Sequence, residues 1–153
     1  YRLGWVAAGR YAQAVQRQKY ATSLATTVPV QIAVAEYLKH GGFDLHLRRL
    51  RQHLATQERQ LVADIEALFP AGTRLARPGG GYFVWLELPG HVDTLRLHED
   101  ALARRISIAP GPLFSAKREF SHYLRLNFGH PANAQQRDAL ATLGDLIREQ
   151  LTS

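Results

Sequence analysis

The chain has 153 residues, a formal net charge of +6, and neither Cys nor Met. Its length predicts one domain, or one domain with part of a second. The lack of Cys excludes a disulfide framework, thiolate metal ligands and Cys nucleophilic catalysis. The apolar runs are too short and too interrupted to span a membrane. The chain opens on Tyr1 with no Met or targeting segment, so we expect an internal part of a longer protein.

The positive charge comes from 16 Arg and three Lys, and residues 1–35 contain no acid. Such an excess is compatible with a face that binds nucleic acid or another anion. It is also compatible with ordinary solvated helix faces. The sequence has no recognised nucleic-acid motif and no run of like charge, which favours the second interpretation.

The predicted elements begin with an apolar strand over residues 3–8 and a helix over about residues 9–23. Pro29 suits the first turn of a second helix, which ends near His40 before two glycines. The clearest helix covers about residues 43–69, because apolar side chains recur there at steps of three and four. These side chains are Phe43, Leu47, Leu50, Leu54, Leu61, Ile65 and Leu68.

In the second half, strands are predicted over residues 73–76, 82–88, 106–109 and 123–128, with a turn over residues 77–81. Helices are predicted over about residues 92–105 and 133–151. Asn133 and Gln136 have the spacing of a capping box at the start of the last helix. Mixed strands and helices predict the α/β class, as an α+β sandwich in which helices pack on one small sheet.

Several common motifs are absent. No two of the seven His have the four-residue helical spacing of a zinc protease, so we expect no metal site. There is no Gly-x-Ser-x-Gly nucleophile elbow. The glycines at 79–81 precede a strand, whereas a phosphate-binding loop follows a strand and opens a helix. They therefore predict a flexible turn.

The strand predicted over residues 123–128 carries an unusual arginine. Alternation places Leu124, Leu126 and Phe128 on one face and Tyr123, Arg125 and Asn127 on the other. An Arg on a strand otherwise suited to burial needs an anionic partner. That partner is either an internal carboxylate or a ligand carboxylate, which a guanidinium grips with two parallel hydrogen bonds. The spacing leaves both open.

Arg2 raises a similar question at the start of the chain. It lies beside an apolar segment and close to Gly4, which would let another group approach the backbone. Arg commonly binds phosphate. From spacing alone, an ordinary surface Arg is the simpler interpretation.

An ordered series of segments resembles the class I/II, fold-type I aminotransferases that use pyridoxal phosphate (PLP). YRLGWV at residues 1–6 resembles the segment just after the Schiff-base lysine, and PGGGYFVWLELP at 78–89 resembles a strand of the small domain. Residues 46–51, 106–111 with Phe114, and 123–129 complete the series. The resemblance implies that residues 1–25 are the tail of the large cofactor-binding domain. Residues 26–153 would be the small C-terminal domain, with a mainly antiparallel sheet.

Two branches of this group share most of these segments. Residues 46–51, 85–89, 110–115 and 141–144 look most like the MocR-type regulators of the GntR family, which join a winged-helix DNA-binding domain to an aminotransferase-like domain. The implied function is the C-terminal part of the PLP-binding effector domain of such a regulator. The alternative is the C-terminal part of a genuine class I/II aminotransferase. A simple anion-binding or structural module is a third hypothesis.

The resemblance also implies roles for two residues. Arg2 matches the arginine that binds the PLP phosphate, and Arg125 matches the arginine that binds the substrate α-carboxylate. None of Lys19, Lys39 and Lys117 occupies the Schiff-base motif, so that lysine is expected upstream. We therefore expect no catalytic residue, no bound PLP and no activity in this chain alone. For the parent, the implied partners are an amino acid or amine, DNA and a second copy in a homodimer, in the cytoplasm.

Overall fold

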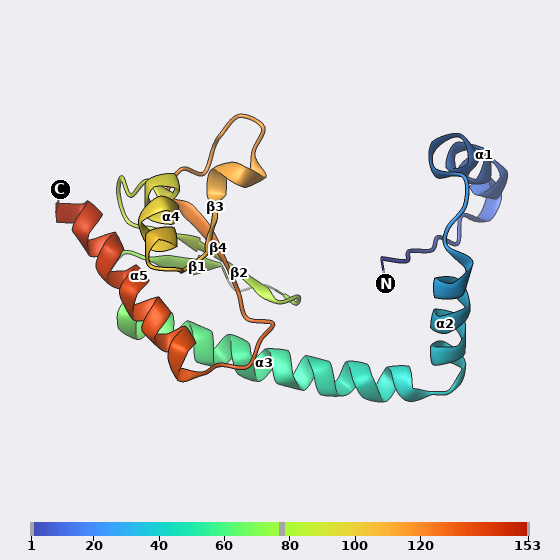
Figure 1. Ribbon diagram of the computed structural model, residues 1–153, viewed down its shortest axis with the longest axis horizontal. Helices are drawn as coiled ribbons and strands as arrows, with labels where there is room; N and C mark the ends of the chain where they lie inside the picture. The colour runs from blue at the N-terminus through green and yellow to red at the C-terminus, as the bar shows by residue number, and fades with distance from the viewer. Residues whose placement is uncertain (1, 77–78, 153) are drawn as a thin grey trace. The chain divides into compact units, whose positions relative to one another are not determined.

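The computed structural model describes residues 2–76 and 79–152 (Figure 1). The chain divides into an N-terminal unit, Tyr1–Arg49, and a C-terminal unit, Leu50–Ser153. Helix α3, Gly42–Leu68, contains the point of division. Arg77 and Pro78 of the predicted turn lie outside the described residues. The boundary between residues 25 and 26, which the resemblance implies for the two domains of the parent, stays a prediction.

The N-terminal unit contains helices and no strand within residues 2–49. A short 3₁₀ turn, η1 (Gly9–Tyr11), leads into α1 (Ala12–Ser23), and α2 spans Val28–Lys39. These helices confirm the sequence prediction. The strand predicted over residues 3–8 is wrong: this segment has no regular structure. A strand needs a neighbour for its backbone hydrogen bonds, and the four strands of the described sheet all lie between residues 74 and 127.

The C-terminal unit is built on a four-stranded antiparallel sheet, which confirms the predicted fold class. Its strands are β1 (Arg74–Ala76), β2 (Phe83–Glu87), β3 (Ala109–Pro110) and β4 (Tyr123–Asn127), in the order β1-β2-β4-β3. Helices α4 (Thr94–Ala103) and α5 (Ala134–Thr152) pack beside the sheet (Figure 1).

Strand β3 begins three residues later than predicted. The backbone N–H of Ile106 donates to Ala101 O at 2.9 Å, so this amide completes the end of α4 and is not available to the sheet. At the other end, Pro110 lacks the N–H that would continue the ladder. The 3₁₀ turn η2 (Gly111–Phe114), which the sequence did not predict, follows at once.

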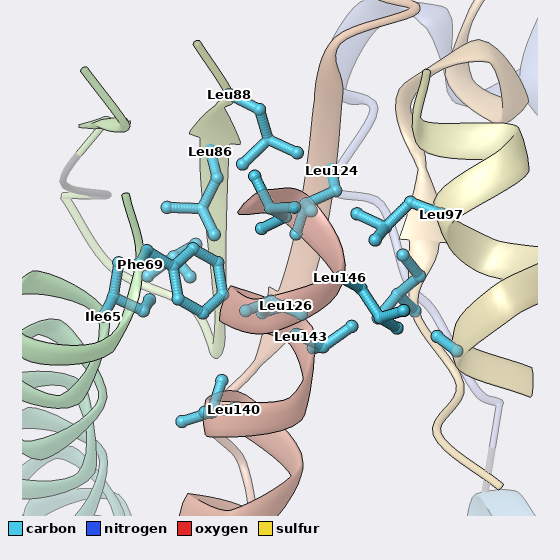
Figure 2. Packing of buried hydrophobic residues seen from close by; sticks show 14 of the residues in the cluster. Ile65, Phe69, Leu86, Leu88, Leu97, Leu124, Leu126, Leu140, Leu143 and Leu146 are labelled. Atoms are coloured by element: carbon cyan, nitrogen blue, oxygen red, sulfur yellow. The ribbon is translucent and has the colours of Figure 1, made fainter. Parts of the chain in front are cut away.

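One face of the sheet supplies the core. Val84 and Leu86 on β2 and Leu124 on β4 are fully buried, as the alternation of a half-buried strand requires. Helices α3, α4 and α5 cover this face (Figure 2). These helices contribute Leu61, Ile65, Leu97, Ala101, Leu140, Leu143, Leu146 and Ile147 to the core, and Phe69, directly after α3, adds to it.

Side-chain caps fix the starts of α4 and α5. Asn133 Oδ1 accepts a hydrogen bond from Gln136 N at 2.8 Å, which confirms the predicted cap of α5. Asp93 Oδ1 accepts from Leu95 N at 2.8 Å and from Arg96 N at 3.3 Å at the start of α4. Each carboxylate or amide oxygen satisfies backbone donors that the first helical turn leaves free.

The end of α3 docks closely against α5. A Cβ placed on Gly144 would lie 2.2 Å from the carbonyl oxygen of Leu68, so a larger residue would force the two helices apart. Arg148 Nη2 donates to the same carbonyl oxygen at 2.6 Å. This contact satisfies one of the carbonyl groups that the last turn of a helix leaves without a partner.

Candidate ligand-binding site

The face of the sheet opposite the core carries polar and aromatic side chains. Arg125 lies on β4, with Trp85 of β2 and Ala109 of β3 as its register partners on either side. Neither Trp85 nor Arg125 is fully buried. The structure therefore places this arginine at the centre of a sheet, on the face that α3, α4 and α5 leave uncovered.

Two phenylalanine rings hold the guanidinium of Arg125. Its Cζ lies 4.1 Å from the ring centroid of Phe83 and 4.4 Å from that of Phe114. Phe83 begins β2 and Phe114 ends η2, so the two rings come from different segments. At these distances both rings make favourable cation–π contacts. Where a ring stacks on a guanidinium, it contacts the face of the group, and the in-plane N–H groups stay available for a carboxylate.

No carboxylate within the described ranges lies at ion-pair distance from Arg125. Glu87 shares its sheet face, yet it pairs with Arg74 at 3.5 Å and lies 3.9 Å from His122 Nε2. The hydrogen bonds of the described residues include none from the Arg125 side chain. Within residues 2–76 and 79–152, no internal carboxylate serves as the partner of Arg125.

An aromatic cluster extends from the Arg125 site. Trp85 makes edge contacts with Phe114 and Phe120, at centroid distances of 5.4 and 5.9 Å, and stacks on Tyr123 at 5.7 Å. Gly111 allows the connecting loop to close, because a Cβ there would lie 2.2 Å from Phe120 O and 2.8 Å from Tyr123 O. The closed loop brings Phe114 to the sheet face.

Arg2 belongs to the N-terminal unit and is exposed. Its φ of +53° is unusual for a residue with a side chain. Among the described residues, no acid forms an ion pair with Arg2. Of the three lysines, Lys19 Nζ donates to Leu24 O at 3.2 Å and Lys39 pairs with Glu36 at 2.6 Å.

Other kinds of site find no support in the part of the chain that the structure describes. There, no group of three or more His, Asp or Glu side chains is arranged to hold a metal ion. Among the same residues, no helix combines the length and apolar character needed to cross a membrane.

The two phenylalanines that contact Arg125 were not identified as functional by sequence reasoning. In the sequence, both are part only of segments that resemble the aminotransferase family, Phe83 within residues 78–89 and Phe114 beside residues 106–111. Phe83 lies opposite Asn127 in the β2–β4 register, diagonal to Arg125. This pairing joins distant parts of the sequence. The alternation of side chains along one strand does not predict which strand pairs with it.

A model of the family described as Aminotransferase class I and II matches residues 1–142. Among curated relatives, the HTH-type transcriptional regulator YdcR of Escherichia coli is 38% identical over 99% of this chain. The regulator YjiR of the same species is 33% identical over 95% of it. The aromatic-amino-acid aminotransferase 1 of Thermococcus litoralis is 28% identical over 99%. The chain spans 32%, 31% and 36% of the lengths of these three relatives.

Solved structures of aminotransferases share the fold. The kynurenine aminotransferase of Pyrococcus horikoshii, solved in complex with PMP, superposes with a TM-score of 0.83 at 26% identity. The alignment covers 92% of this chain and 35% of that one. The α-aminoadipate aminotransferase LysN of Thermus thermophilus superposes with a TM-score of 0.77 at 28% identity, over 92% of this chain and 36% of its own.

Proposed function

The chain belongs to the class I and II aminotransferase family, and from this membership we propose that Arg125 binds the α-carboxylate of an amino-acid ligand. We propose further that the chain is the C-terminal part of the PLP-binding effector domain of a MocR/GntR-type transcription regulator. The whole protein would bind DNA through a domain outside this chain. Its ligand would be an amino acid or a related amine.

The state of Arg125 is the observation that carries this proposal. A charged side chain that the fold shields from water is usually paired with an opposite charge. Here the guanidinium has aromatic rings against it and no carboxylate at ion-pair distance within residues 2–76 and 79–152. A free α-carboxylate would supply the missing charge through two parallel hydrogen bonds.

Arg2 and Arg125 would have separate tasks toward PLP and the ligand. The guanidinium of Arg2 would bind the phosphate, while that of Arg125 would orient the amino acid by its carboxylate. PLP, when bound, supplies an electron sink for the bonds at the ligand's α-carbon. The energy of the carboxylate contact could favour a closed arrangement of the ligand-binding domain. In a regulator, such a population shift would change DNA binding.

Sequence similarity favours the regulator over the enzyme. Identity to the two Escherichia coli regulators is 38% and 33%, against 28% to the Thermococcus litoralis aminotransferase. The enzyme stays the second candidate because the fold superposes on a kynurenine aminotransferase with a TM-score of 0.83. In that case the carboxylate contact of Arg125 would align the α-proton and closure would exclude water.

Two assays on the complete, PLP-loaded protein separate the candidates. The first measures binding to the DNA upstream of its own gene, with and without a panel of L-amino acids. The second measures transamination of the same panel with 2-oxoglutarate. For a regulator we expect DNA binding that an amino acid alters. Arg125→Lys should leave DNA binding intact and shift the response to roughly thirtyfold higher amino-acid concentration. Turnover without DNA binding would favour the enzyme. If the protein shows no response of DNA binding to amino acids and no turnover, both candidate functions are contradicted.

A further inference from the structure

We propose that Phe83 and Phe114 are positioning residues that hold the Arg125 guanidinium ready for the ligand carboxylate. This inference rests on the proposed function of Arg125. It adds that affinity for amino acids depends on the two rings even though neither carries charge nor needs to touch the ligand. We call Phe83 and Phe114 the aromatic clamp.

The first argument is geometric. Both centroids of the aromatic clamp lie within 4.4 Å of Arg125 Cζ, at 4.1 and 4.4 Å. The two rings come from different elements, β2 and η2, and make no ring contact with each other among the described residues. A ring stacked on a guanidinium restricts the orientation of its plane, and with it the direction of its in-plane N–H donors.

The second argument concerns the cost of ordering. An arginine side chain loses considerable rotamer entropy when a ligand immobilises it. A framework arginine usually avoids this cost by pairing with an acid. Such a pair would also occupy the donors that the ligand needs. The aromatic clamp orders Arg125 without consuming a donor, and preorganisation of this kind raises affinity.

The loop after β3 gives the clamp a matched control. Phe114 and Phe120 are both 43% exposed, and both make an edge contact with Trp85. Only Phe114 also contacts Arg125, whereas Phe120 contacts Tyr123 at 5.5 Å. Replacing either ring by Leu removes its edge contact with Trp85. Only one of the two changes the surroundings of the guanidinium.

The test compares these variants in the complete, PLP-loaded protein by titration with L-alanine. Its methyl side chain minimises contact with a ring, so the measurement reports chiefly on the carboxylate. We expect Phe114→Leu to weaken binding roughly fivefold. Phe114→Tyr, which keeps a ring, should stay within about twofold of the unchanged protein. Phe120→Leu should bind as the unchanged protein does.

A double-mutant cycle assigns the effect to Arg125. If the clamp acts through the guanidinium, Phe114→Leu should cause no further loss once Arg125→Lys is present. The inference is wrong if Phe114→Leu and Phe120→Leu weaken L-alanine binding equally. It is also wrong if Phe114→Leu still weakens binding when Arg125→Lys is present. If Arg125→Lys itself leaves L-alanine affinity unchanged, the proposed function fails. If Arg125→Lys weakens L-alanine binding and Phe114→Leu does not, the inference about the aromatic clamp is wrong and the proposed function of Arg125 stands.

A second measurement needs no ligand and uses chain 1–153. Proton NMR of the Arg125 side chain should show upfield shifts, because its Cζ lies close to two ring centroids. Phe114→Leu should remove part of that shift and Phe120→Leu should leave it in place. Arg125 side-chain shifts typical of a solvated arginine in the unchanged chain would contradict the clamp.

Discussion

The two units differ in how much of their apolar surface is buried within chain 1–153. In the C-terminal unit, three helices and one sheet face enclose a continuous core, and Val84, Leu86 and Ile147 are fully buried. In the N-terminal unit, none of residues 2–49 is buried, and Trp5 is 87% and Ile32 is 59% exposed. Both units contain α-helices. Burial, more than helix formation, is therefore what distinguishes them.

This difference has a direct thermodynamic consequence. Isolated helices shorter than about 12–15 residues are marginal in water, and α1 and α2 have 12 residues each. The C-terminal unit instead gains stability from apolar area removed from water. The difference also separates the two candidate ligand contacts. Arg2 lies in the unit without buried residues, and Arg125 lies on a sheet backed by the core.

The largest expected effect tests the core itself. Ile147→Ala, at a fully buried position on α5, should lower the free energy of unfolding by about 2–5 kcal/mol. Ile32→Ala on α2 should change it by less than about 0.5 kcal/mol, because that side chain is already largely exposed. Urea denaturation of chain 1–153 followed by circular dichroism compares the two. Similar losses in both variants would contradict the comparison.

The close contact of α3 with α5 gives the next effect. Gly144→Ala places a Cβ against the backbone oxygen of Leu68, so we expect a loss of about 1–3 kcal/mol. Without that clash, Gly→Ala in a helix would gain roughly 1 kcal/mol, so the sign of the change is informative. Gly4→Ala in the N-terminal unit is the control, since nothing lies within 4 Å of its added Cβ. A stabilised Gly144→Ala would show that the two helices do not approach this closely.

The cap of α4 gives a smaller effect. Asp93→Ala removes an acceptor for two backbone N–H groups and should cost about 1 kcal/mol. Asp93→Asn keeps an acceptor and should recover most of the loss. Thermal melting of the two variants measures the difference. An Asn variant as unstable as the Ala variant would indicate that the hydrogen bonds to Leu95 and Arg96 do not account for the effect.

The smallest expected effect concerns PLP in chain 1–153 alone. We expect none of its three lysines to serve as the Schiff-base lysine, so added PLP should give only the spectrum of the free cofactor and no transaminase turnover. The measurement is absorbance after borohydride reduction, followed by peptide mapping. A stoichiometric adduct at one lysine would contradict this expectation and direct attention to that lysine.

Local sequence signals predicted most of the fold. The steps of three and four in α3, the Pro at the start of α2 and the Asn133 cap all describe interactions within a few residues, and the structure has them. The strand over residues 3–8 failed because a strand depends on a partner that the local sequence does not specify. The late start of β3 depends on one hydrogen bond from Ile106 to the end of α4.

In the candidate site, too, local signals predicted part of the arrangement, and contacts between distant segments determined the rest. The alternation along β4 predicted that Arg125 lies on the face opposite Leu124, which is fully buried in the core. The sequence of β4 alone does not predict whether Arg125 pairs with an internal carboxylate or with a ligand carboxylate, because its neighbours come from β2 and η2. Phe83 and Phe114 reach the guanidinium through sheet register and loop closure, and neither can be read from the sequence near Arg125.

The most direct test of the account is the response of Arg125→Lys in the complete protein. Lysine keeps the charge and loses the planar two-point contact. Loss of a partner from such a contact commonly costs about 2–5 kcal/mol. We expect the lower end, roughly a thirtyfold loss of amino-acid affinity, with little change in PLP binding. Spectroscopic titration with L-amino acids, run beside a melting curve, measures both properties. Unchanged affinity with a lowered melting temperature would show that Arg125 is structural and would contradict the account.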